Sequence, residues 1–214
     1  MQRMPRIPKE QLLLVLVLTL IAAVSGGILA VVNHLTEPRI KELERQATKE
    51  ALAVCLPGAG NFRKEESLPA GVGEDVREVY RGYYSIENEP AGVVVKVEPR
   101  GYGGRITMMA GITEEGKVAG IKVLSHSETP GLGAKIKKDD FLQQDAIREG
   151  GLEEPPALVQ DGGKVEAITR ATISSRAVVR GINQALAVAE VFLAPATGGP
   201  EDETASVERG DGEG

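Results

Sequence analysis

An uncharged run near the N-terminus constrains this chain more than any other feature. From Leu12 to Val32, 21 residues pass without an Asp, Glu, Lys or Arg. A helix rises about 1.5 Å per residue, so this run would be roughly 30 Å long, the thickness of the hydrocarbon core of a bilayer. The sequence therefore predicts a transmembrane helix over residues 12–32, preceded by a short N-terminal segment, residues 1–11.

A cleavable signal peptide is the alternative interpretation of the same run. Leu12 to Ala23 has the length of a signal-peptide core, and Ala23-Val24-Ser25 matches a small-residue cleavage site. Apolar residues continue past that site to Val32, which favours an uncleaved anchor. We therefore expect the helix to remain in the membrane, in contact with lipid.

The charges on either side of the run predict its orientation. Basic residues precede it, whereas charges of both signs follow it between residues 37 and 44. The positive-inside rule then places the N-terminus in the cytoplasm and the main domain outside it. A cleaved signal peptide would export the same domain. The prediction is a single-pass protein of the cell inner (plasma) membrane with an extracytoplasmic main domain.

Residues 33–58 follow as a predicted stalk helix. Apolar residues recur there at helical spacing, at Ile40, Leu43, Ala47 and Val54. Pro57-Gly58 is a strong helix stop. The single cysteine, Cys55, lies near the end of this helix and is expected to be a small buried residue.

Residues 59–194 have the pattern of one globular domain. Four segments have the composition of strands: Val76–Ile86, Ala91–Val97, Arg105–Ile112 and Lys117–Leu124. A further strand is predicted at Lys164–Ile168, with helices at Asp139–Arg148 and Arg176–Leu193. Consecutive strands joined by short turns imply an α+β domain, built on an antiparallel sheet with flanking helices. Residues 195–214 are acidic and poor in apolar side chains, which predicts a disordered tail.

Composition excludes several classes of function. The net charge of −6 leaves no basic stripe to neutralise phosphates, so we expect no nucleic-acid partner. One cysteine is too few for an iron–sulfur cluster held by this chain alone, and two histidines argue against a dedicated zinc site. No metal site is predicted, and any redox chemistry must come from an organic cofactor.

Four hydroxyl side chains stand where the predicted strand 164–168 meets the last predicted helix. The segment reads Ile168-Thr169-Arg170-Ala171-Thr172-Ile173-Ser174-Ser175. A Ser or Thr here can cap the helix, whose first N–H groups have no partner within it. Those donors and the positive end of the helix dipole can also bind a phosphate. The pattern alone leaves both interpretations open: a capped helix behind a hydroxyl-rich loop, or a phosphate site.

Two glycine-rich loops lie upstream of this segment. Glu128-Thr129-Pro130-Gly131-Leu132-Gly133 follows a predicted strand directly, and its Pro-Gly pair predicts a tight turn whose amides can approach a flat ligand. Gly101-Tyr102-Gly103-Gly104 lies between two predicted strands. It is not a dinucleotide-binding fingerprint, because no helix with the third glycine follows it. Taken singly, each loop is equally consistent with an ordinary turn.

Together, these three segments behind one anchor helix resemble the RnfG family of Rnf electron-transport complexes, with the NqrC family of sodium-pumping NADH:quinone reductases as a related family. The stretch from Thr169 to Thr172 resembles the flavinylation motif of FMN-binding domains, Ser/Thr-Gly-Ala-Thr. The last Thr of that motif carries FMN through a phosphoester bond, which implies attachment at Thr172. Arg170 stands where the motif usually has glycine. An arginine there either tolerates the conformation that glycine permits or blocks it, and it could pair with the phosphate.

The resemblance also implies which residues contact the FMN. They are Thr172 and Ser174 in the hydroxyl-rich segment, Glu128, Thr129, Gly131 and Leu132 in the loop before it, and Tyr102. Thr129 would be a polar and Leu132 an apolar contact to the isoalloxazine ring. Tyr102 either stacks on the flavin or packs in the core. His126 either donates protons to reduced flavin or has a structural role, which is commoner for a lone histidine.

The function that the resemblance implies is electron transfer within a larger complex of several subunits. Such complexes couple electron flow between reduced ferredoxin and NAD to transport of sodium ions or protons. The implied partners are the other membrane subunits and an exported flavin transferase, with FAD as the FMN donor. We find no nucleophile-and-base pair for catalysis by this chain alone. The alternatives are a membrane-tethered module of the same fold without flavin, in which Arg170 marks a lost site, and a flavodomain of another extracytoplasmic redox chain.

Overall fold

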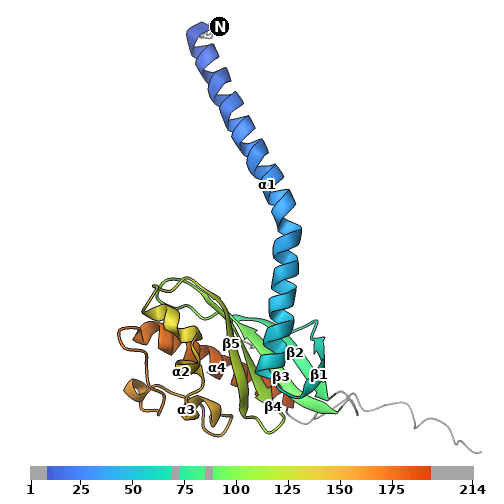
Figure 1. The fold of residues 1–214 in the computed structure, drawn as a ribbon, viewed down its shortest axis with the longest axis vertical. Coiled ribbons are helices and arrows are strands. Elements are labelled where there is room, and N and C mark those ends of the chain that lie inside the picture. Colours follow the sequence, from blue (N-terminus) through green and yellow to red (C-terminus); the bar gives the residue numbers. More distant parts are fainter. Residues whose placement is uncertain (1–8, 69–72, 85–88, 194–214) are drawn as a thin grey trace, which may run out of the picture. The chain divides into compact units, whose positions relative to one another are not determined.

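Residues 9–68, 73–84 and 89–193 are described by a computed structural model of the chain (Figure 1). The chain divides into two units, Met1–Lys49 and Glu50–Gly214. The tail for which disorder is predicted, residues 195–214, lies outside the described residues, as do residues 1–8.

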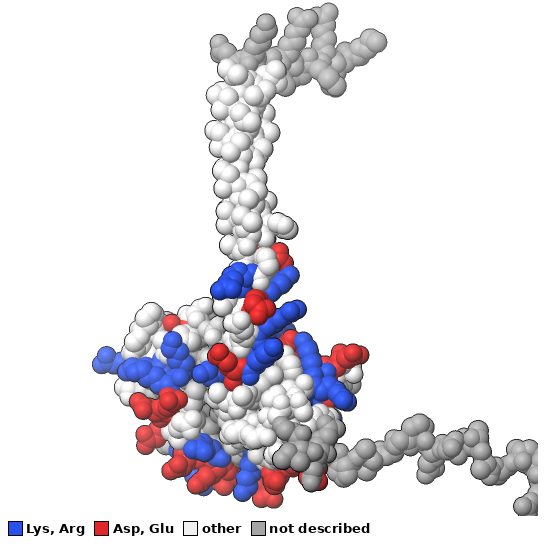
Figure 2. Space-filling view, turned by 45° about the vertical axis from the view of Figure 1, so that its right-hand side comes forward, with Lys and Arg blue, Asp and Glu red and all other residues white. Residues whose placement is uncertain are grey.

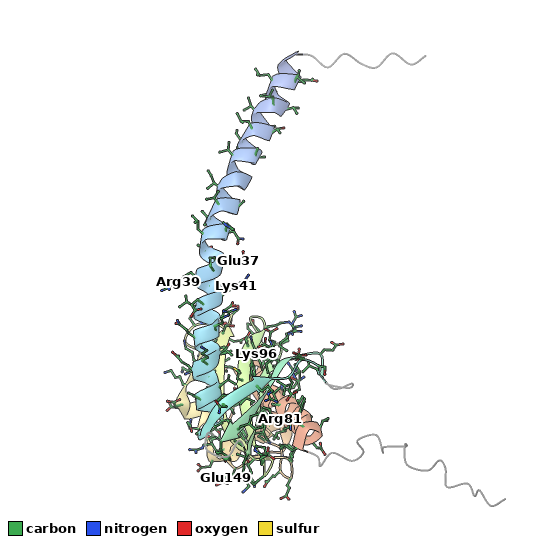
Figure 3. The ribbon with its side chains drawn as sticks, turned by 90° about the vertical axis from the view of Figure 1, so that its right-hand side faces the viewer. Glu37, Arg39, Lys41, Arg81, Lys96 and Glu149 are labelled. Atoms are coloured by element: carbon green, nitrogen blue, oxygen red, sulfur yellow. The ribbon has the colours of Figure 1, made fainter. Side chains whose placement is uncertain are left out.

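One continuous helix, α1 (Lys9–Cys55), runs through both the predicted anchor and the predicted stalk, with Pro38 inside it. It is long and apolar enough to cross a membrane, and the side chains from Leu12 to Val32 are exposed. Figure 2 shows this stretch without charged side chains. Charges begin beyond it, where Glu37 and Lys41 form an ion pair of 2.6 Å one helical turn apart (Figure 3). The exposed apolar surface is what a helix surrounded by lipid requires.

The second unit is built on a five-stranded antiparallel sheet in the order β1-β2-β3-β4-β5 (Figure 1). Its strands are β1 (Ala59–Lys64), β2 (Val76–Tyr84), β3 (Pro90–Val97), β4 (Ile106–Thr113) and β5 (Val118–His126). Each strand pairs with the next one along the chain, as short connections favour. The α+β fold is therefore confirmed, with four strands near the predicted positions. Strand β1 was not predicted, because its sequence, AGNFRK, lacks a β-branched residue and its side chains are half-buried or exposed.

A long helix, α4 (Thr172–Leu193), covers one face of the sheet and packs on β3 and β4. Val93, Val95 and Val97 share that face because side chains alternate along a strand. Gly181 brings the helix close, since a Cβ there would lie 3.0 Å from the Met108 Sδ. The larger of the two buried hydrophobic clusters of the unit lies between α4 and this face of the sheet.

The last turn of α1 belongs to this unit and covers part of the other sheet face. Leu52 and Cys55 pack there with Val94 and Met109. The backbone of α1 touches the sheet at Gly111, where a Cβ would lie 2.0 Å from the Cys55 carbonyl oxygen. Glycine is therefore required at this crossing, and both faces of the central strands are buried.

The segment between β5 and α4 differs from the sequence prediction. It has two short 3₁₀ helices, η1 (Gly133–Lys137) and η2 (Val159–Asp161). The helix predicted at 139–148 is two single turns, α2 (Asp139–Leu142) and α3 (Asp145–Arg148), because Gln144 leaves the helical conformation.

The strand predicted at Lys164–Ile168 does not form in the described chain; Val165 makes one isolated bridge to Leu158. The side-chain amide of Gln144 pairs with the backbone of the next residue, Glu166. It accepts from the Glu166 N–H at 2.7 Å and donates to the Glu166 carbonyl at 2.9 Å. The predicted strand is therefore wrong: Val165 pairs with the backbone of Ala157 and Val159, and Glu166 pairs with a side chain.

Candidate cofactor site

A cavity of about 610 Å³ lies where α4 begins, a size typical of small-molecule sites. Its lining comes from three separate segments: Tyr102; Glu128, Thr129, Leu132 and Gly133; and Arg170, Ala171, Thr172, Ile173 and Ser174. Six of the seven residues implied as FMN contacts are in this lining. The seventh, Gly131, lies in the same loop but outside the lining.

The N-terminus of α4 supplies unpaired donors to the cavity. The first helical hydrogen bond runs from the Ser175 N–H to the Ala171 carbonyl at 2.9 Å. The N–H groups of Thr172, Ile173 and Ser174 precede it and have no carbonyl partner within the helix. Donors of this kind, at the positive end of the helix dipole, attract phosphate. Thr172, in the cavity lining, therefore lies next to donors of the kind that bind phosphate.

A tight turn, Ile168–Ala171, leads into α4. The Ala171 N–H donates to the Ile168 carbonyl at 2.9 Å, and Arg170, the third residue, has a φ of 63°. A positive φ at that position is the signature of a type II turn, which favours glycine. Arg170 adopts the left-handed conformation and lines the cavity, so the arginine tolerates this backbone.

The loop Thr129–Leu132 makes the same kind of turn on the other wall. The Leu132 N–H donates to the Thr129 carbonyl at 3.2 Å, with Pro130 second and Gly131 third in the turn. Gly131 has a φ of 78°, as a type II turn requires at this place. Gly131 thus shapes the loop that presents Thr129 and Leu132, and a Cβ added at Gly131 would meet open space.

Glu128 ties the three segments together from beneath the cavity. Its side chain is 4% exposed. The carboxylate accepts hydrogen bonds from the Ser174 hydroxyl, from the Gly103 N–H at 3.0 Å and from the Tyr102 N–H at 3.3 Å. A buried carboxylate is stable only with such partners. Glu128 is therefore a bridge between α4 and the loop of Tyr102 as well as part of the wall.

Glycines allow the chain to close around this carboxylate. A Cβ at Gly101 would lie 2.3 Å from the Glu128 Oε1, and one at Gly133 would lie 2.9 Å from the Oε2. The sequence pattern showed glycine-rich loops, but it did not show that they surround one side chain. Gly133 lies only four residues after Thr129 in the sequence, and this closeness was the one signal that Gly133 would line the cavity.

Apolar side chains stand at the mouth of the cavity. Tyr102 is 71% exposed, which rules out the core-packing interpretation, and Leu132 and Ile173 are also exposed. A flat aromatic ligand would find apolar contacts there. Ile173 was missed by sequence reasoning because an exposed isoleucine in a helix has no distinctive pattern.

His126 lies outside the cavity lining. Its Nδ1 accepts a hydrogen bond from the Glu128 N–H at 3.3 Å, so it helps to shape the loop after β5. Among the described residues, no group of three His, Cys, Asp or Glu side chains is placed to hold a metal ion.

A second hollow, about 740 Å³, lies on the other side of the turn. Lysines and carboxylates line it, including Lys135, Lys164 and Glu166, and it reaches the hydroxyl-rich segment at Ile168 and Thr169. Neither Thr172 nor Ser174 is in its lining. The smaller cavity is therefore the better candidate for a phosphate-bearing cofactor.

Comparison with known proteins agrees with this geometry. A model described as the FMN-binding domain matches residues 101–187, and one described as the RnfG N-terminal region matches residues 14–54. The G subunit of the Na(+)-translocating ferredoxin:NAD(+) oxidoreductase complex of Acetobacterium woodii is 33% identical over 81% of this chain and 88% of its own length. The chain belongs to the RnfG family.

Other members of the RnfG family match to a similar extent. The G subunit of the proton-translocating ferredoxin:NAD(+) oxidoreductase complex of Clostridium ljungdahlii is 31% identical over 82% of this chain and 89% of its own length. Among solved structures, the crystal structure of Shewanella oneidensis NqrC covers 64% of this chain and 70% of its own, at 18% identity and a TM-score of 0.44.

The residues of the cavity fit FMN. The size of the cavity suits a flavin, and the mouth of the cavity is apolar. The free N–H groups at the start of α4 suit a phosphate next to Thr172. The segments that line it, from Tyr102 to Ser174, fall within the part of the chain that matches the FMN-binding domain.

Proposed function

We propose that this chain is the electron-carrying flavoprotein subunit of a membrane-bound Rnf-type complex, with FMN bound covalently to Thr172 through a phosphoester. Relatives in the RnfG family are named for complexes that are ferredoxin:NAD(+) oxidoreductases and translocate protons or Na(+). We extend to this chain the same electron transfer between ferredoxin and NAD, coupled to ion transport.

One observation carries the covalent part of the proposal. Thr172 lines the cavity and is the first residue of α4, next to N–H groups without carbonyl partners. A phosphate esterified to Thr172 would accept hydrogen bonds from those donors and lie at the positive end of the helix dipole. The neighbouring Arg170, also in the lining, adds a positive charge.

The chain's own residues bind and orient the cofactor. A flavin supplies one- and two-electron steps that side chains lack, while the protein sets its position and surroundings. Leu132, Ile173 and Tyr102 offer apolar contact at the cavity mouth, where their exposure leaves a path for electron exchange with a partner. Covalent attachment removes the need to bury the ring for affinity, which suits such an open site.

The membrane arrangement is part of the same proposal. Helix α1 anchors the chain by a single span, with the N-terminus in the cytoplasm and the unit that holds the cavity outside it. The partners are membrane lipid, the other membrane subunits and a flavin transferase that modifies Thr172.

Intact-mass spectrometry of the full chain produced with an active flavin transferase tests the proposal. We expect a mass increase equal to one esterified FMN in the wild type and in Ser125→Ala, and none in Thr172→Ala. Ser125 is a matched control, because its hydroxyl is exposed on β5 and lies outside both the motif and the cavity lining. An unmodified wild type beside a second flavoprotein that the transferase does modify would contradict the proposal and favour a flavin-free module.

A further inference from the structure

Ser175 is buried beneath the turn that leads to Thr172. The side chain has 0% exposure. Its Oγ accepts a hydrogen bond from the Ile168 N–H at 3.0 Å and donates one to the Ala171 carbonyl at 3.0 Å. Ile168 and Ala171 are the first and last residues of the turn, so a single hydroxyl binds both of its ends.

The turn needs this support because of the residue at its third position. Arg170 is the one non-glycine residue with positive φ in the described part of the chain. The left-handed conformation brings the Cβ of an L-residue close to its own carbonyl, which disfavours it for everything except glycine. Without other restraints, an arginine would therefore move the turn away from the observed shape.

The second type II turn of the site shows the contrast. Gly131 occupies the third position there, and both the Leu132 and Ala134 N–H groups donate to the Thr129 carbonyl. Backbone bonds suffice for that turn, since glycine adopts positive φ freely. The turn with Arg170 carries, in addition, the two side-chain hydrogen bonds of Ser175.

We propose that Ser175 is a positioning residue for FMN attachment: its hydroxyl holds the turn Ile168–Ala171 in the shape that presents Thr172, despite the arginine at position 170. The inference rests on the proposed function. Ser175 itself lies outside the cavity lining and touches no part of a ligand there. Its effect reaches Thr172 through Ala171, whose carbonyl accepts from both the Ser175 hydroxyl and the Ser175 N–H.

A double-mutant cycle tests this inference. Four full-length chains are compared: wild type, Ser175→Ala, Arg170→Gly and the double variant. Removal of the hydroxyl leaves the partly buried Ile168 N–H without its partner, so we expect attachment to slow about tenfold when arginine is retained at position 170. With glycine at that position the turn keeps its shape unaided, so the same removal should slow attachment only about twofold. The loss should fall on kcat of the transferase reaction, because Ser175 is buried and its substitution alters no exposed side chain.

Ser174→Ala is the matched control, since its hydroxyl bonds Glu128 and not the turn. Its effect on the attachment rate should be the same in the wild-type and Arg170→Gly backgrounds. The inference would be overturned if Ser175→Ala slowed attachment equally in both backgrounds. It would also be overturned if the effect of Ser174→Ala on the attachment rate depended on residue 170 as strongly as that of Ser175→Ala.

Amide hydrogen exchange of the flavin-free chains gives a readout that does not depend on attachment. Ser175→Ala should speed exchange at Ile168 and Ala171 about tenfold in the wild-type background and about twofold in the Arg170→Gly background. A wild type that accepts no FMN would refute the proposed function, whereas this exchange cycle would still decide whether Ser175 holds the turn. If Ser175→Ala changed the exchange rates equally in the two backgrounds, the positioning role of Ser175 would be refuted.

Discussion

The Ser174 hydroxyl donates a hydrogen bond to the carboxylate of Glu128, a residue 46 positions earlier in the chain. The same carboxylate accepts from the Gly103 N–H at 3.0 Å, so the first turn of α4, the loop after β5 and the loop before β4 meet at one buried charge. These contacts involve protein groups alone. The protein's own groups therefore hold the cavity wall together.

Glu128→Gln should destabilise the flavin-free protein. Glutamine offers one acceptor oxygen and turns an NH₂ group toward donors, so at least one buried donor loses its partner. We expect the free energy of unfolding of the globular unit to fall by about 1–3 kcal/mol, as measured by denaturant unfolding. Glu98→Gln is the control, because Glu98 is partly exposed and pairs with Arg77 at the surface. A loss at Glu98 as large as that at Glu128 would contradict the bridging role.

Gly133→Ala should damage the cavity more than Gly131→Ala. A Cβ at Gly133 would lie 2.7 Å from the Ser174 Oγ and 2.9 Å from the Glu128 Cβ, whereas one at Gly131 meets open space. We expect about 1–3 kcal/mol of destabilisation at Gly133 from crowding, together with slower FMN attachment. Gly131→Ala should cost about 1–2 kcal/mol through its positive φ and leave the wall intact. Attachment rates measured by intact mass distinguish the two, and slower attachment in Gly131→Ala than in Gly133→Ala would show this account to be wrong.

Stability should depend on the charge of Glu78. Burial opposes its ionisation, but hydrogen bonds from Lys64 and Tyr80, with the charge of Lys96 (Figure 3), outweigh burial and hold the pKa of Glu78 below its usual value of 4.5. A lowered pKa stabilises the fold above the unfolded-state pKa, and this stabilisation disappears as pH falls through the folded-state pKa. Glu78→Gln should therefore lower the melting temperature near pH 7, by a few degrees at most for a partly exposed network.

The difference between wild type and Glu78→Gln should shrink as the pH falls from about 5 to below 4. Thermal melts of both proteins across this range provide the measurement. A difference that stays constant with pH would mean that lost packing, and not lost charge, explains the effect.

Cys55 should resist alkylation in the folded protein. Burial raises the pKa of its thiol to about 12, and its Sγ donates a hydrogen bond to the Met109 carbonyl at 3.3 Å. The thiolate is the reactive form and is nearly absent at pH 8. Iodoacetamide followed by mass spectrometry should label the chain in denaturant and leave the native chain unlabelled. Rapid labelling of the native chain would mean that the last turn of α1 leaves the sheet readily.

Local patterns predicted the elements that depend on nearby residues. The α+β class, strands β2 to β5 and the course of α4 follow from side-chain periodicity, because each element buries one face of its own sequence. The same reasoning missed β1, whose pairing with β2 supplies what its composition lacks. It also predicted a strand at Lys164–Ile168, where the structure has one isolated bridge at Val165 and a Gln144 side chain paired with Glu166.

By itself, the sequence determined the apolar span, the order of the motifs and the hydroxyl-rich start of α4, since each is a property of neighbouring residues. The tertiary structure decided that Glu128 meets Ser174 and that Arg170 adopts a positive φ with both ends of its turn bound to Ser175. By its intrinsic backbone preference alone, an arginine would have adopted a negative φ. The two hydrogen bonds of Ser175 outweigh that preference, because a hydrogen-bonding group left without its partner costs about as much as the strained backbone it helps to hold.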